Sequence, residues 1–330
     1  MLFTCNLKNI IKEGWNMKLR NIKIFQLFVL LGILAILTSC GGGQTQSTGK
    51  NIFLGGIEGL EVSFESLGLL EEGIDTIYDT EDFPLELSLQ NKGEESIPLG
   101  KASFRLIGPA KEDFENIPAW TVSNTAILDK KSEFNPEGGL ESVTFTPNDP
   151  AAKYKRKVTG FVDINWNVEY SYDYKTHLLI NDVCFKGDIT DKKVCQVKEA
   201  KTFAVSGAPL TVTKVEQDTG GKGVVTLKIT VQNAGGGEST YPNEDFDTRY
   251  SQFSYEIDEP EKWECKSGGR ENKGRFAEVN ANGPTSTEVL CKLKTALADD
   301  DLYTKTLGFT LNYKYKELVQ KKLRIKESVK

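Results

Sequence analysis

The sequence predicts an all-β chain made of two tandem antiparallel β-sandwich domains. Three observations predict this class: apolar residues alternate with polar ones over several segments, Asn-x-Gly turn sequences follow them, and both features recur about 142 residues further on. An alternation with a period of two places one set of side chains on one face of a sheet, so each segment is expected to be a half-buried strand. No long helix is predicted, and single helical turns are expected within 109–120 and 292–300.

The repeated segments define the order of the expected strands. Alternating apolar residues run into Asn91-Lys92-Gly93 in one half and into Asn233-Ala234-Gly235 in the other. Two longer alternations, over 162–174 and 307–315, end in Tyr-x-Tyr-Lys sequences that lie about 141 residues apart. The Asn-x-Gly and the Tyr-x-Tyr-Lys sequences recur at nearly the same separation, which indicates tandem copies of one fold. Shorter strands are expected between polar clusters at 60–64, 102–107, 143–146 and 253–257.

The N-terminal region has the three-part pattern of a secretory signal. Lys18, Arg20 and Lys23 form a basic head, an apolar run of about 14 residues follows over 24–37, and small residues precede Cys40. The run is too short to span a bilayer comfortably, which favours cleavage over a permanent span. Residues 1–16 are expected to be a mis-annotated start, with translation beginning at Met17. The alternative is an uncleaved N-terminal helix in which Cys40 is an ordinary residue.

The tetrad Leu37-Thr38-Ser39-Cys40 resembles the lipobox of bacterial-type lipoproteins. The resemblance implies a signal peptide over 17–39 and a diacylglyceryl group on Cys40, which becomes the mature N-terminus. Two acyl chains hold a protein stably on a membrane, whereas one binds only marginally. The Gly, Ser and Thr-rich stretch within 40–55 is then a flexible tether. The expected location is extracytoplasmic and membrane-anchored.

Four cysteines remain after Cys5 and the anchor are set aside. An oxidising compartment favours two disulfides, Cys184 to Cys195 and Cys265 to Cys291, although four cysteines allow three connectivities. A zinc site is the other reading, and it is disfavoured because the spacings lack a CxxC and the chain has a single histidine. We therefore expect no bound metal.

Composition and motifs disfavour nucleic-acid binding and catalysis. The net charge of -6, with both signs interspersed, lacks the clustered basic face that nucleic acids require. His177 is the only histidine, and neither GxSxG nor HExxH occurs, so no catalytic site and no cofactor are predicted. An enzyme that relies on carboxylates alone is the remaining enzymatic alternative.

Acidic loops and aromatic residues are the last candidates for binding. Carboxylates cluster at 79–82, 244–247 and 299–301; they are expected to be solvated turns, with calcium binding as the alternative. Alternation favours a core position for Trp166, Tyr170, Tyr172 and Tyr174 over an exposed sugar-binding stripe. Trp120 and Trp263 lie in loop-like segments, where each can serve recognition or cap the end of a sandwich.

The repeated segments are similar to the tandem immunoglobulin-like modules of prokaryotic surface proteins, particularly the cell-adhesion-related domain (CARDB-like). We expect a first module over 56–206 and a second over 207–330, joined near Ser206-Gly207-Ala208-Pro209. The resemblance implies a structural, adhesive or assembly role at the cell surface without catalysis. Expected partners are the membrane, through the lipid anchor, and other envelope proteins or polysaccharide. The alternative is an accessory solute- or glycan-binding lipoprotein.

Overall fold

The chain is all-β, as its alternating pattern predicts. The computed structural model describes residues 52–146, 150–190, 194–276 and 285–329. The predicted start, signal peptide and Cys40, and the tether up to residue 51, lie outside the described residues. Within the described part the helical structure is one 3-10 turn, η1 (Lys111–Asp113), inside the range where a turn is expected. The turn expected within 292–300 is wrong, because strand pairing continues to Leu293 and no helix follows.

The described residues form four sheets, whose strand partners are mostly antiparallel. One sheet has the order β1 (Leu60–Phe64), β5 (Glu86–Asn91), β9 (Leu140–Thr144), and a small one has the order β4 (Asp82–Phe83), β10 (Ala152–Tyr154), β7 (Phe114–Glu115). A third has the order β12 (Glu199–Ala200), β14 (Leu210–Gly221), β15 (Val224–Asn233), β21 (Ser286–Leu293), β18 (Trp263–Ser267), β19 (Arg270–Glu271). The largest contains β2 (Leu69–Glu71), β3 (Ile74–Tyr78), β22 (Leu302–Lys326), β11 (Phe161–Lys186), β6 (Ala102–Gly108), β8 (Thr121–Ser123), β13 (Phe203–Val205), β16 (Glu238–Thr240), β17 (Gln252–Ile257) and β20 (Lys273–Arg275).

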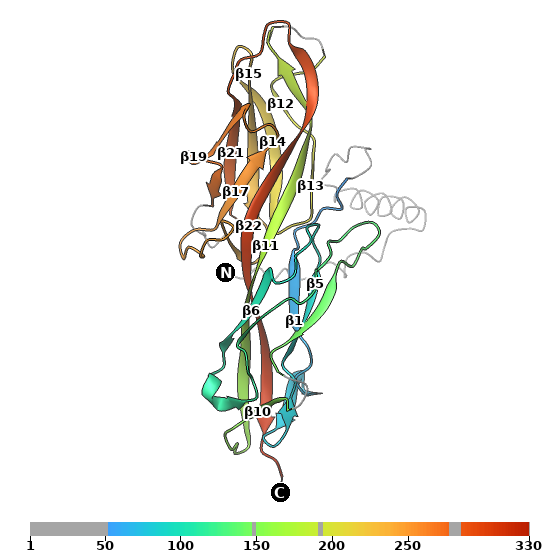
Figure 1. Cartoon of the computed structure of the whole chain (residues 1–330), viewed down its shortest axis with the longest axis vertical. Coiled ribbons are helices and arrows are strands. Elements are labelled where there is room, and N and C mark those ends of the chain that lie inside the picture. Colours follow the sequence, from blue (N-terminus) through green and yellow to red (C-terminus); the bar gives the residue numbers. More distant parts are fainter. Residues whose placement is uncertain (1–51, 147–149, 191–193, 277–284, 330) are drawn as a thin grey trace, which may run out of the picture. The chain divides into compact units, whose positions relative to one another are not determined.

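The two longest strands, β11 and β22, pair with each other along almost their entire lengths (Figure 1). The antiparallel register runs from Phe161 opposite Lys326 to Lys186 opposite Leu302, with one irregularity between Ile180 and Val183. Both strands are longer than the alternating segments predicted at 162–174 and 307–315. The longest strand of each repeat therefore lies beside the longest strand of the other.

The paired strands β11 and β22 form a two-stranded ribbon. Each half of this ribbon pairs with strands from a different part of the chain. The early part of β11 pairs with β6, and its later part pairs with β13. The early part of β22 pairs with β17, whereas its end pairs in parallel with β3. As a result, residues of both predicted modules share one sheet, and 50–330 forms one compact unit.

The strand pairing shows the same repeat as the sequence. Strands β1, β5 and β9 have the same order and direction as β14, β15 and β21. Leu60 pairs with Asn91 at the end of one set, and Leu210 pairs with Asn233 at the end of the other. The Asn-x-Gly sequences thus mark equivalent strand ends.

Four tyrosines from the ribbon form a closed ring of contacts in the core. Tyr172 lies opposite Tyr315, and Tyr174 lies opposite Tyr313. The centroids of neighbouring tyrosine side chains are 5.4 to 6.3 Å apart, and each of the four tyrosines is at most 2% exposed. Edge and tilted contacts at such distances are favourable between aromatic rings. The ring joins β11 and β22 at the middle of their ladder.

The predicted junction at Ser206-Gly207-Ala208-Pro209 is buried. The Glu94 carboxylate accepts hydrogen bonds from the backbone N–H groups of Leu54, Gly55 and Gly207, at 2.9, 2.8 and 2.6 Å. Glu94 itself is only 8% exposed. A buried carboxylate requires such donors, because leaving one unsatisfied is costly. One side chain thus fixes both the entry of the chain into the fold and the connection between the repeats.

Both predicted disulfides are present. Cys184 bonds to Cys195, and Cys265 bonds to Cys291. The second bond joins directly opposed residues of β18 and β21, with Cα atoms 3.9 Å apart. Each bond lies within one of the two sequence halves.

Candidate functional site

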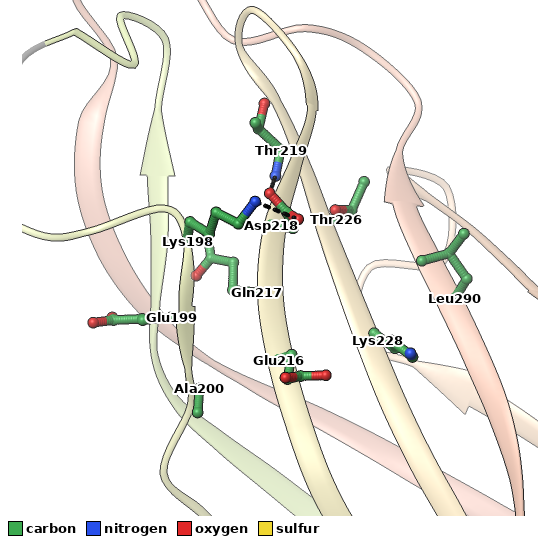
Figure 2. Close-up of a pocket in the computed structure, with 10 residues that line it drawn as sticks. All are labelled: Lys198, Glu199, Ala200, Glu216, Gln217, Asp218, Thr219, Thr226, Lys228 and Leu290. Atoms are coloured by element: carbon green, nitrogen blue, oxygen red, sulfur yellow. Dashed lines mark hydrogen bonds and ion pairs between the residues drawn. The ribbon is translucent and has the colours of Figure 1, made fainter.

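The surface of the described residues carries three shallow hollows in which a ligand could lie. The first, of about 430 Å³, lies on the sheet of β12, β14, β15 and β21 (Figure 2). Its lining side chains include five charged residues, and each of them has an ion-pair partner: Lys198 with Asp218, Glu199 with Lys201, Glu216 with Lys214, and Lys228 with Glu288. The charges of this hollow are therefore already balanced within the protein.

The second hollow, of about 480 Å³, lies where the two repeats meet along the ribbon. The lining residue Glu95 pairs with the single histidine, which is not itself part of the lining: His177 Nε2 lies 3.1 Å from Glu95 Oε2. Lys101 Nζ lies 3.5 Å from Asp173 Oδ2 in the same region. No serine, threonine or cysteine among the described residues approaches the His177 ring in a hydrogen bond, so the pair lacks the nucleophile of a catalytic triad.

The third hollow, of about 510 Å³, lies beside Trp120 and is formed by η1, β7 and the end of β10. Four charged side chains line it, namely Lys111, Glu112, Glu115 and Lys155. Within the described residues none of the four has an ion-pair partner, and Lys111 Nζ lies 5.9 Å from the centre of the Trp120 ring. This hollow differs from the other two because all of its charged side chains lack an ion-pair partner among the described residues.

Carboxylates in two of the predicted acidic loops accept hydrogen bonds from the protein. Asp79 accepts the backbone N–H groups of Ser328 and Val158, at 3.0 and 3.4 Å, and the Ser328 bonds hold its pKa below the usual 3.8. The Arg249 backbone and side-chain N–H groups likewise lower the pKa of Asp247. Among the described residues, no three His, Cys, Asp or Glu side chains are grouped closely enough to hold a metal ion.

The aromatic stripe of β11 belongs to the core, as the alternation predicts. Trp166 is fully buried, and Tyr170 is 4% exposed. Trp263 is also buried, at 3% exposure, so it packs inside the fold rather than serving surface recognition. Trp120 is partly buried and packs against the core from the edge of the third hollow.

A half-buried carboxylate lies next to the four tyrosines. Tyr170 donates its hydroxyl hydrogen to Glu317 Oε2 at 2.5 Å, and the two residues are direct partners in the ladder. Burial raises the pKa of Glu317 above its ordinary value of 4.5, although the Tyr170 bond opposes this. Burial also raises the pKa of Tyr170, so its hydroxyl stays protonated as a donor. Glu317 follows the inward positions 307–315 at the same spacing of two, but the predicted strand ends at 315.

Comparisons with known proteins identify no family. No family model matches the chain, and no curated protein matches it. A comparison with solved structures finds the secreted serine protease VesC from Vibrio cholerae, at 11% identity and a TM-score of 0.18 over 77% of this chain and 50% of that one. This chain therefore corresponds to about half the length of that protein. So low a TM-score carries no argument about fold or activity.

No helix among the described residues is long and apolar enough to cross a bilayer.

Proposed function

We propose that this chain is a membrane-anchored, extracytoplasmic structural, adhesive or assembly lipoprotein without catalytic activity. In this proposal Cys40 carries the lipid, and two immunoglobulin-like β-sandwich modules form the displayed part. The observation that carries the proposal is the continuous pairing of β11 with β22, which joins both repeats through one ladder. A protein that holds other components at a fixed distance needs such a stiff connection, whereas a flexible linker would let its modules swivel.

Two further observations support this proposal. Disulfides persist in oxidising environments, and the two bonds agree with a location outside the cytoplasm. The only histidine is held by Glu95, and no serine, threonine or cysteine among the described residues forms a hydrogen bond with its ring. Both observations favour a protein that makes contacts over one that converts a substrate.

The lipid anchor is tested by substituting its cysteine. We expect the full-length chain to sediment with membranes and to be labelled on intact cells by an amine reagent that cannot cross the membrane. Cys40→Ser should release the chain from the membrane fraction, while the control Cys5→Ser should leave it bound. Retention of the Cys40→Ser chain in membranes, or no labelling of intact cells, would contradict the proposal.

A second candidate function is an accessory solute- or glycan-binding lipoprotein. The hollow beside Trp120 favours it, because this site combines a partly exposed aromatic ring with charged groups that have no ion-pair partner in the described residues. Binding pockets typically combine apolar surface with a few polar groups that orient the ligand. Binding and structural roles are compatible in one displayed protein.

A further inference from the structure

The hollow beside Trp120 has unused hydrogen-bonding capacity. Two carboxylates, Glu112 and Glu115, can accept hydrogen bonds, and two ammonium groups, Lys111 and Lys155, can donate them. The hollow of Figure 2 differs in this respect, because its charges are paired, as where Lys198 contacts Asp218. The donors and acceptors of the hollow beside Trp120 lie near an aromatic ring and do not pair with one another. Such a site is suited to a ligand that carries many hydroxyl groups.

The walls of this hollow are held in place before any ligand arrives. The backbone N–H of Lys155 donates to the carbonyl of Asp113 at 2.9 Å, and Arg156 forms an ion pair with the Asp113 carboxylate. Strands β10 and β7 pair directly beneath, with Tyr154 opposite Phe114. Walls that are ordered in the free protein reduce the entropy that binding must offset.

One further lining residue has a fixed orientation. Asn116 has a left-handed backbone, with φ of 62°, and its Nδ2 donates to the carbonyl of Ala151 at 3.0 Å. Because that bond fixes the amide, Oδ1 is the atom left to accept a hydrogen bond. Asn116 therefore adds one acceptor to the groups that line the hollow.

We propose that the hollow beside Trp120 binds a neutral glycan. The Trp120 ring supplies an apolar surface against which the C–H face of a sugar ring can pack, while Glu112, Glu115 and Lys155 exchange hydrogen bonds with its hydroxyls. A neutral ligand fits because the charged lining contains two carboxylates and two ammonium groups, which leaves no excess of either sign. This inference rests on the proposed extracytoplasmic location, where polysaccharides are encountered.

The test measures binding of defined sugars to the full-length chain in detergent, by titration calorimetry. The probes are neutral hexasaccharides of β-linked glucose, α-linked glucose and β-linked N-acetylglucosamine. We expect at least one to bind with a Kd below about 5 mM, and we expect Trp120→Ala to weaken that binding at least about tenfold. Lys155→Ala should weaken it as well, whereas the exposed Lys198→Ala at the hollow of Figure 2 should leave the Kd within about twofold.

Two results would overturn the glycan site. One is that none of the three probes binds, and the other is that Lys155→Ala and Glu112→Gln both bind as the unmodified chain does. Because Trp120 packs against the core, these two exposed substitutions keep the test valid if Trp120→Ala fails to fold. The outcome is separate from membrane anchoring, because sugar binding is measured on solubilised protein and the anchor is measured by release of the Cys40→Ser chain.

Discussion

Tyr174 donates a hydrogen bond to Oδ1 of Asn91 at 3.1 Å, across the core of the fold. Tyr315 makes the same bond to Asn233 at 3.0 Å, in the other repeat. In both copies the asparagine amide also donates to the carbonyl four residues further along the chain. The two landmarks of the sequence repeat, the Asn-x-Gly turn and the Tyr-x-Tyr strand, are therefore bonded partners in each copy.

The first prediction concerns these two bonds. Tyr174→Phe and Tyr315→Phe should each lower the free energy of unfolding by about 1–3 kcal/mol. Each removes a buried hydroxyl that donates to the asparagine oxygen and accepts a backbone N–H, from Glu95 or from Gly237. Chemical denaturation of both variants measures the change. A double-mutant cycle of Tyr174→Phe with Asn91→Ala should show coupling. If the two substitutions are additive, the hydrogen bond does not stabilise the fold.

The second prediction concerns the glycines of the repeated turns. A methyl group on Gly93 would overlap the Tyr174 hydroxyl and lie 2.7 Å from the carbonyl oxygen of Glu58. Gly93→Ala should therefore destabilise the fold by more than about 1 kcal/mol. Gly236 is the matched control, since its added methyl group would meet nothing within 4 Å. Thermal denaturation should show a lower Tm for Gly93→Ala alone, and an equal effect at both positions would contradict the close packing.

The third prediction is a pH dependence that originates at Glu317. Burial raises its pKa in the folded chain, so the folded state binds this proton more tightly than the unfolded state does. Its contribution to stability is therefore fully present below the unfolded pKa and is lost as the pH rises through the folded pKa. Glu317→Gln, which keeps an oxygen acceptor for Tyr170, should equal the unmodified chain near pH 4 and exceed its stability at pH 7. Denaturation at both pH values checks this, and a Gln variant that is less stable at pH 7 would contradict it.

The fourth prediction compares the two disulfides. Cys265 and Cys291 are 26 residues apart, whereas Cys184 and Cys195 are 11 apart. A crosslink restricts the unfolded chain more when it closes a longer loop. Replacing Cys265 and Cys291 by Ser should therefore cost about 3–4 kcal/mol, and replacing Cys184 and Cys195 by Ser about 0.8 kcal/mol less. Unfolding of the two double variants under oxidising conditions measures both. The reverse order would show that local packing outweighs loop length.

Much of this fold could be predicted from the sequence because alternation reports which face of a strand is buried. Strand β1 has the predicted bounds, and β6 and β17 differ from theirs by one residue. The alternation does not show which strands pair with each other. The apolar residues Leu323 and Ile325 continue the pattern beyond the predicted strand end, and their pairing with β3 joins segments far apart in the chain.

The candidate sites were less predictable than the strands. From the sequence, Glu94 is expected to be an ordinary carboxylate in a polar turn. In the fold it accepts hydrogen bonds from three backbone N–H groups of two distant segments. Trp120 could be singled out as a loop tryptophan. Its neighbour Lys155 lies 35 residues away in sequence and reaches the same hollow through the pairing of β10 with β7. Side-chain groupings of this kind depend on tertiary contacts.

The central claim is that the two repeats form one stiff unit through the ladder of β11 and β22. Native-state hydrogen exchange in increasing urea tests it most directly, because it measures the opening free energy of β5 and β15 separately. We predict that the slowest amides of both strands converge on one free energy with one urea dependence. Two separate opening free energies, each with its own smaller urea dependence, would show independent modules and contradict the account.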